Sequence, residues 1–190
     1  MTNQSTKAII YLTGKPGVGK YTIAKEIARQ EGYVICDNQL INNPIFALLN
    51  YDGFTKIPEF AWDKISLIRD VIFEFIALEK HNNYILTNNL YETQGDALLF
   101  EQVQTLAEKR GSVFVPVRLI ISREEHLKRI IQPERRDRWK SIDPEDVYDE
   151  TPLLNITHPN LLQIEVRHLK AEDVAKQIIM NILRCNLKKI

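Results

Sequence analysis

A glycine-rich segment that ends in a lysine is the part of this sequence best suited to chemistry. Residues 14–22 read GKPGVGKYT and contain three of the seven glycines in the chain. Glycines at the spacing G-x-x-x-x-G-K let successive backbone N–H groups turn toward one point and surround phosphate oxygens. Lys20 would then reach the β- and γ-phosphates of a nucleotide. A turn that binds nothing does not need a lysine there, so the spacing predicts a phosphate-binding P-loop.

Tyr21 departs from the usual form of this motif. The position after the lysine commonly holds a Ser or Thr whose hydroxyl binds Mg²⁺, and a tyrosine side chain is too long to take that role in place. Thr22, the next residue, is a candidate contact for the α-phosphate or, through water, for the metal. Its hydroxyl could equally satisfy backbone groups in the first turn of its own helix.

The glycine-rich segment lies between a predicted strand and a predicted helix. Residues 7–12 form a short apolar run typical of a buried parallel strand, and the apolar residues of 19–30 recur at a helical period. Further strands are expected at residues 33–36, 84–87, 112–121 and 161–166, and further helices at 40–49, 58–81, 96–110, 123–131 and 171–183. Asp96 is expected to cap its helix. Pro116 cannot donate to a sheet, so it predicts an irregular strand or one that begins nearer Val117.

Five strands separated by helices predict an α/β fold with one parallel sheet, right-handed crossovers and helices on both faces. The sequence has no internal repeat or linker, so residues 1–190 are expected to form a single domain. Ligands of such sheets bind beyond the carboxyl ends of the strands. The site should therefore form just after Leu12, Cys36, Thr87 and Ile121.

The composition is that of an ordinary globular domain. The 25 basic and 25 acidic residues balance, and 44% of the residues are hydrophobic. A neutral chain lacks the basic excess with which domains grip nucleic acid or anionic membranes, so neither partner is expected. Cys36 and Cys185 are too few and too far apart for a disulfide framework or a zinc site. The sequence has no signal peptide or membrane-spanning run, which favours a cytoplasmic protein and leaves the oligomeric state open.

Three segments of the chain resemble the small P-loop kinases, which include adenylate-kinase-like, shikimate-kinase-like and chloramphenicol-phosphotransferase-like proteins. These segments are GKPGVGKYT, VRLIISREEHLKRIIQPERR and LLQIEVRHLKAEDVAKQI. The resemblance implies a three-layer P-loop NTPase fold with strand order 2-3-1-4-5, a short Arg-rich lid, and ATP with Mg²⁺ as cofactors. Nucleoside monophosphate kinases of this group carry G-K-G-T in the loop, so a residue without a hydroxyl before the Thr is compatible with it. The implied nucleotide-binding residues are Gly14, Pro16, Gly17, Val18, Gly19, Lys20, Tyr21, Thr22 and Arg129.

A basic segment follows the helix expected at residues 123–131. Residues 123–140 hold seven basic and four acidic side chains, whereas residues 143–150 hold five acids and no base. Phosphoryl transfer develops charge on the transferred oxygens, and guanidinium groups that close over them stabilise it. The resemblance places the lid at about 132–142. Arg135 and Arg138 are its candidate catalytic residues beside Lys20, although arginine-rich turns are also often solvated surface.

The segment between the second and third strands is long enough to bind an acceptor, and we place the acceptor-binding region at about 37–83. Asp37 could accept the proton of an attacking hydroxyl or cap the helix that follows. Arg69 resembles the substrate-anion arginine of such kinases, or it is a surface residue of an amphipathic helix. Asn88 could bind acceptor hydroxyls, or it could simply form a turn.

These features predict an ATP-dependent phosphotransferase that moves the γ-phosphate of ATP to a small hydroxylated acceptor. A nucleoside monophosphate kinase is an alternative, because the acceptor-binding region is long. A non-catalytic ATP-binding regulatory protein is another, since Tyr21 replaces the usual hydroxyl and no Asp follows the third strand.

Overall fold

The computed structural model describes residues 7–187, without the side chains of residues 136–138 and 186–187. The strands are β1 (Ala8–Thr13), β2 (Val34–Asp37), β3 (Tyr84–Asn88), β4 (Val113–Ile120) and β5 (Leu162–Glu165). The helices are α1 (Lys20–Glu31), α2 (Asn38–Leu48), α3 (Glu59–Leu78), α4 (Gln94–Arg110), α5 (Arg123–Ile130), the 3-10 helix η1 (Pro133–Arg138), α6 (Glu145–Tyr148) and α7 (Ala171–Leu187). All strand pairs are parallel, and their order β2-β3-β1-β4-β5 confirms the predicted sheet.

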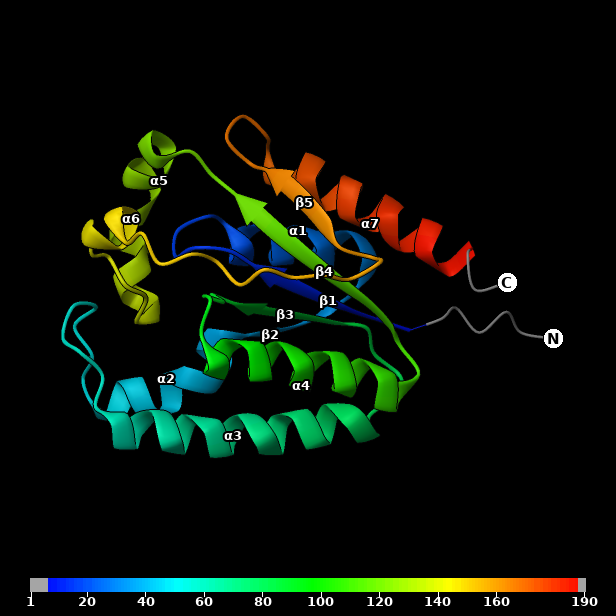
Figure 1. Ribbon diagram of the computed structural model, residues 1–190, viewed down its shortest axis with the longest axis horizontal. Helices are drawn as coiled ribbons and strands as arrows, with labels where there is room; N and C mark the ends of the chain where they lie inside the picture. The colour runs from blue at the N-terminus through cyan, green and yellow to red at the C-terminus, as the bar shows by residue number, and fades with distance from the viewer. Residues whose placement is uncertain (1–6, 188–190) are drawn as a thin grey trace.

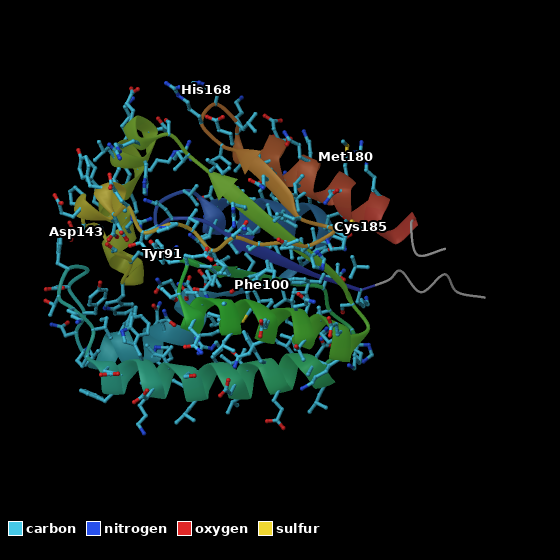
Figure 2. All side chains as sticks on the ribbon, in the orientation of Figure 1. Tyr91, Phe100, Asp143, His168, Met180 and Cys185 are labelled. Atoms are coloured by element: carbon cyan, nitrogen blue, oxygen red, sulfur yellow. The ribbon has the colours of Figure 1, made fainter. Side chains whose placement is uncertain are left out.

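Helices cover both faces of the sheet and form three layers (Figure 1). One core cluster joins the sheet to α1 and α7, and the other joins it to α2, α3 and α4. Figure 2 shows Phe100 on α4 and Met180 on α7, on opposite sides of the sheet. Cys36 and Cys185 belong to different clusters, so the sheet separates the two thiols. Within the described residues, no helix has both the length and the apolar character needed to cross a bilayer.

β1 lies at the centre of the sheet and leads directly into the glycine-rich loop. Every residue of β1 is buried, and its side chains alternate between the two clusters, with Ile9 and Tyr11 on one face and Ile10 and Leu12 on the other. A strand buried on both faces needs the nearly continuous apolar run of residues 7–12. Its carboxyl end therefore holds the start of the loop rigidly.

The expectation for Pro116 was wrong, because β4 runs without a break through it. The C=O of Phe114 accepts a hydrogen bond from Asn160 Nδ2 at 3.0 Å, which shows that this residue faces the β5 side. Pro116 is two residues further along and faces the same side. β5 begins only at Leu162, which pairs with Val117. At Pro116 there is thus no β5 residue to accept a hydrogen bond, and the missing N–H of proline costs the sheet nothing.

Two helix caps were predicted with different success. Asp37 caps α2, which is one of the two roles predicted for it: its carboxylate accepts a hydrogen bond from Leu40 N at 3.1 Å. The cap predicted for Asp96 was wrong: α4 is capped by Thr93, whose hydroxyl accepts from Asp96 N at 3.2 Å. The Asp96 carboxylate instead accepts from Tyr91 N at 2.7 Å and fixes the turn between β3 and α4.

Candidate functional site

The glycine-rich loop leaves β1 through a position that only glycine can occupy without strain. Gly14 has φ +142°, and a Cβ atom there would lie 2.7 Å from the carbonyl oxygen of Leu119 in β4. Since that neighbour is backbone, it cannot move aside as a side chain would. Gly14 thus lets the loop turn tightly against the neighbouring strand.

The loop ends at the amino terminus of α1. Gly19 is the N-cap residue, has φ 107° and offers no side chain to cap the helix. The first N–H groups of α1 are therefore left for another acceptor, and the positive end of the helix dipole points the same way. This is the geometry that favours a bound phosphate.

Lys20 is buried at the first position of α1, and its ammonium group donates to three oxygens. They are the carbonyls of Gly14 at 2.6 Å and Lys15 at 2.9 Å, and the side-chain oxygen of Asn89 at 2.7 Å. Burial holds the pKa of Lys20 well below its usual value, and the positive charges of Lys140 and Arg135 lower it further. An anion in front of Lys20 would reverse this effect.

A cavity of about 590 Å³ opens in front of the loop. Five basic side chains and one acidic side chain line it among the described residues: Lys20, Lys25, Arg129, Arg135, Lys140 and Glu134. One part of its wall is apolar and comes from Val166 of the β5–α7 connection, Leu169, Ala171 and Val174. Another part is polar and comes from Asn38, Gln39, Thr87 and Asn89 at the ends of β2 and β3. The cavity thus offers a cationic centre between an apolar and a polar wall.

The predicted lid lies over this cavity, at the end of the molecule where α5 and α6 lie (Figure 1). Arg135 lines the cavity, and its Nε donates to the carbonyl of Ser141 at 2.9 Å. Burial lowers the pKa of Arg135, and Asp146 of α6 opposes that shift. The side chain of Arg138, the other predicted lid residue, lies outside the described residues.

Tyr21 contacts the lid through its ring. The ammonium of Lys140 lies 4.9 Å from the ring centroid, and that of Lys25 lies 5.2 Å from it. Both distances are those of cation–π contacts. The residue that replaces the usual hydroxyl therefore joins the start of α1 to the segment that follows η1.

Two side chains of α5 contact backbone carbonyls of the glycine-rich loop. Arg129 donates to the carbonyl of Val18 and to that of Val166, both at 3.3 Å, and pairs with Glu125 at 2.9 Å. His126 is buried and contacts the carbonyl of Pro16 through Nε2. Arg129 was predicted as a nucleotide-binding residue and lines the cavity, whereas sequence reasoning missed His126, which has no ligand-like spacing.

On the acceptor side, the structure separates the predicted residues. Asp37 is buried and caps α2, and it does not line the cavity; Asn38 and Gln39, which follow it, do. Asn89 rather than Asn88 reaches the cavity, because β3 ends at Asn88 and the chain turns there. The side-chain oxygen of Gln39 is buried and has no hydrogen-bond partner among the residues that the structure describes, so it can receive a ligand hydroxyl.

Arg69 also lies away from the cavity wall. It is half-buried on α3 and donates to the hydroxyl of Ser66 at 2.9 Å. Within the described part of the chain its Nε is buried without a hydrogen-bond partner. Burial chiefly raises the pKa of Tyr11, and the charge of Arg69 lowers it. Arg69 is thus directed into the protein. The alternative prediction, a surface residue of an amphipathic helix, does not describe this position.

The donor atoms at the cavity do not fit an Mg²⁺ ion held by protein carboxylates. Mg²⁺ sites normally use one or two carboxylates together with phosphates and water. At the carboxyl end of β3, the oxygen that contacts Lys20 belongs to the amide of Asn89 and not to a carboxylate. Tyr21, at the position that commonly holds a metal-binding hydroxyl, contacts two ammonium groups. Among the described residues, no group of three or more His, Cys, Asp or Glu side chains could hold a metal. Thr22 lines the cavity but brings only a hydroxyl.

Comparisons with known proteins agree with this geometry at the level of the fold. No protein-family model and no curated protein sequence matches the chain. A gluconokinase from Sinorhizobium meliloti 1021 matches with a TM-score of 0.64 and 15% identity over 96% of both chains. Shikimate kinase from Acinetobacter baumannii matches with a TM-score of 0.53 and 19% identity over 96% of both. APS kinase from Mycobacterium tuberculosis matches with a TM-score of 0.54 and 15% identity, covering 93% of this chain and 98% of the other. The chain has the fold of small P-loop kinases, as the sequence predicted.

Proposed function

We propose that this protein is an ATP-dependent phosphotransferase that transfers the γ-phosphate of ATP to a small hydroxylated acceptor. The observation that carries the proposal is the buried ammonium of Lys20, which faces a cavity lined by four further basic side chains. Turn chemistry does not require a cation there, whereas a triphosphate does. The kinases that share the fold support the same class of reaction.

We assign the phosphates to the glycine-rich loop and the start of α1. The N–H groups of the loop and of the first helical turn would bind phosphate oxygens, and Lys20 would exchange its present oxygen partners for them. Arg135 would approach from the lid side. The Mg²⁺ expected from the sequence would then be bound by the phosphates of the nucleotide and not by carboxylates of this chain.

We assign the nucleotide base to the apolar wall. Val166, Leu169 and Val174 line the cavity near Arg129, so a flat ring could lie between aliphatic side chains and a guanidinium plane. These contacts are not specific for adenine, and the choice of ATP follows from the resemblance and from the lack of a guanine-reading N-K-x-D motif in the sequence.

We assign the acceptor to the polar wall formed by Asn38, Gln39 and Thr87. The unpartnered oxygen of Gln39 is available for an acceptor hydroxyl. In the proposed step, the acceptor oxygen bonds to the γ-phosphorus, the bond from that phosphorus to the β,γ-bridging oxygen breaks, and ADP leaves. Asp37, the residue before the cavity-lining Asn38, is the proposed proton acceptor, although it caps α2 and does not itself line the cavity; this role requires the acceptor hydroxyl to reach past Asn38 to the carboxylate.

A coupled assay of ADP release tests the proposal. A panel of small hydroxylated compounds and nucleoside monophosphates is offered with ATP to the wild type, to Lys20→Ala and to Lys176→Ala, an exposed lysine of α7. We expect at least one acceptor to stimulate ADP release in the wild type and in Lys176→Ala but not in Lys20→Ala. If Asp37→Asn retained full turnover, Asp37 would keep only its role as a cap.

A non-catalytic nucleotide-binding regulator is the second candidate function. The observation that favours it is Asn89, because an amide at the end of β3 cannot supply the charge that an acidic residue would. Lys20-dependent ATP binding without ADP release for any acceptor in the panel would favour the regulator over the kinase.

A further inference from the structure

His126 packs against the glycine-rich loop at Pro16 and Gly17. It is 2% exposed and belongs to α5, and it is not one of the residues that line the cavity. A Cβ atom on Gly17 would lie 3.3 Å from His126 Cδ2 and 3.5 Å from Ile130 Cα. Since Gly17 has φ +84°, the loop turns directly against α5 at this point. The helix is therefore in direct contact with the loop at Gly17.

The contact between His126 and Pro16 fixes the state of the imidazole. A carbonyl oxygen can only accept, so Nε2 must carry the hydrogen that it donates to Pro16 O. Burial lowers the pKa of His126, and the charges of Lys15, Arg135 and Lys20 act in the same direction, while the bond to Pro16 opposes them. The lowered pKa favours the neutral ring, so the contribution assigned to His126 is the direction of its hydrogen bond.

The bond to Pro16 also sets the direction of the next N–H group. None of the described peptide bonds is cis, and in a trans peptide the C=O and the following N–H point in opposite directions. With the Pro16 carbonyl held by His126, which does not line the cavity, the N–H of Gly17 points away from His126, and Gly17 itself lines the cavity. Pro16 has no N–H of its own, so this loop has one donor fewer and depends more on Gly17.

We propose that His126 is a positioning residue for nucleotide binding, which keeps the N–H of Gly17 directed at a phosphate oxygen by anchoring the Pro16 carbonyl. The inference rests on the proposed nucleotide site. It goes beyond that site because His126 itself touches no ligand. The part of the nucleotide whose binding depends on His126 is a phosphate, whereas the base is assigned to the apolar wall of the cavity.

Calorimetric titration of two ligands separates this role from a general effect on folding. ATP carries the phosphates, and adenosine carries only the base and sugar. We expect His126→Phe, which keeps a ring but loses the donor, to weaken ATP binding about tenfold and to change adenosine binding less than about twofold. His126→Gln, whose amide N–H can replace the donor, should recover most of the affinity for ATP.

Three outcomes would overturn the proposal. Unchanged ATP affinity in His126→Phe would show that the contact does not matter, and equal losses for ATP and adenosine would show a structural effect only. Both leave the nucleotide site itself in place. No ATP binding by the wild type, measured first, would overturn this inference together with the proposed function.

A measurement on the wild type keeps the test valid if His126→Phe does not fold. Nitrogen-15 NMR reports which imidazole nitrogen of His126 carries the hydrogen and how the amide of Gly17 responds to ATP. The proposal requires the Nε2–H form before and after ATP is added, and a shift of the Gly17 amide on binding. A hydrogen on Nδ1 alone, or a Gly17 amide that does not respond, would contradict it.

Discussion

The ammonium of Lys20 lies 2.7 Å from the side-chain oxygen of Asn89, the residue that directly follows β3. An amide oxygen accepts a hydrogen bond without cancelling the charge of the donor. Asn89 therefore does not compensate the charge of the Lys20 ammonium, which an incoming anion can do. An amide at this position also cannot hold a metal as a carboxylate could, so one residue affects both the charge and the metal chemistry of the site.

The first prediction concerns the metal dependence of ATP binding by the wild type. Because five basic side chains line the cavity and Asn89 supplies no negative charge, the chain itself can neutralise a triphosphate. We expect the ATP affinity in EDTA to stay within about fivefold of that in excess Mg²⁺, a difference of about 1 kcal/mol. Calorimetry in the two buffers measures it. If ATP binding required Mg²⁺, the basic side chains of the cavity would not be sufficient to neutralise the triphosphate, and this prediction would be wrong.

The second prediction is that Asn89→Asp makes binding depend on the metal. In EDTA the new carboxylate would pair with Lys20 and repel phosphate, which should weaken ATP binding about tenfold. With excess Mg²⁺ the penalty should shrink, since a carboxylate and phosphate oxygens can share the ion. Asn50→Asp adds the same charge at an exposed position after α2 and serves as the control. An equal penalty in both buffers would rule out this account of Asn89.

Some parts of the site could be predicted from the sequence, and others could not. The loop, its strand and its helix are adjacent in sequence, so the local pattern of residues 7–30 was enough to predict them. His126 and Pro16 are 110 residues apart, and only the packing of α5 on the loop brings them together. Asn89 and Asn88 differ by one position, and which of them reaches the cavity depends on where β3 stops.

The lid and the α4 cap show a second limit. The basic composition of residues 132–142 predicted a segment near phosphate, and Arg135 does line the cavity. The short helix α6 was not predicted, because four residues carry too little periodic pattern to be recognised. Asp96 and Thr93 are both good capping residues, and the choice depends on the turn that Tyr91 makes with Asp96.

The third prediction concerns Tyr21 and the lid. Its ring contacts the ammonium groups of Lys25 and Lys140, and each such contact contributes about 0.5–2 kcal/mol. We expect Tyr21→Leu to loosen the segment after η1 and to speed tryptic cleavage within residues 132–142 by about threefold or more. Tyr21→Phe keeps the ring and should be cleaved at a rate nearer the wild type. Identical rates for Tyr21→Leu and the wild type would show that the ring does not hold the lid.

The fourth prediction is the pH dependence of stability that His126 produces. Burial lowers its pKa in the folded protein from the ordinary 6.5, so the unfolded chain binds a proton more readily. The stability due to neutral His126 is present above pH 6.5 and is lost as the pH falls through the lower folded pKa. The free energy of unfolding of the wild type should therefore fall more steeply than that of His126→Gln between pH 7.5 and pH 5. Parallel curves would contradict a lowered pKa.

The fifth prediction concerns Arg110, a buried arginine outside the site. Its guanidinium donates to the carbonyls of Ile76 and Glu79 at the end of α3, and to that of Asn82 at 2.7 Å. Arg110→Met leaves these three carbonyls without a donor, so the free energy of unfolding should fall by about 3 kcal/mol. Lys109→Met, an exposed neighbour, should change it by less than about 0.5 kcal/mol. Equal losses in urea unfolding would mean that Arg110 does not anchor α3, and unchanged ATP affinity in Arg110→Met would place its effect on folding alone.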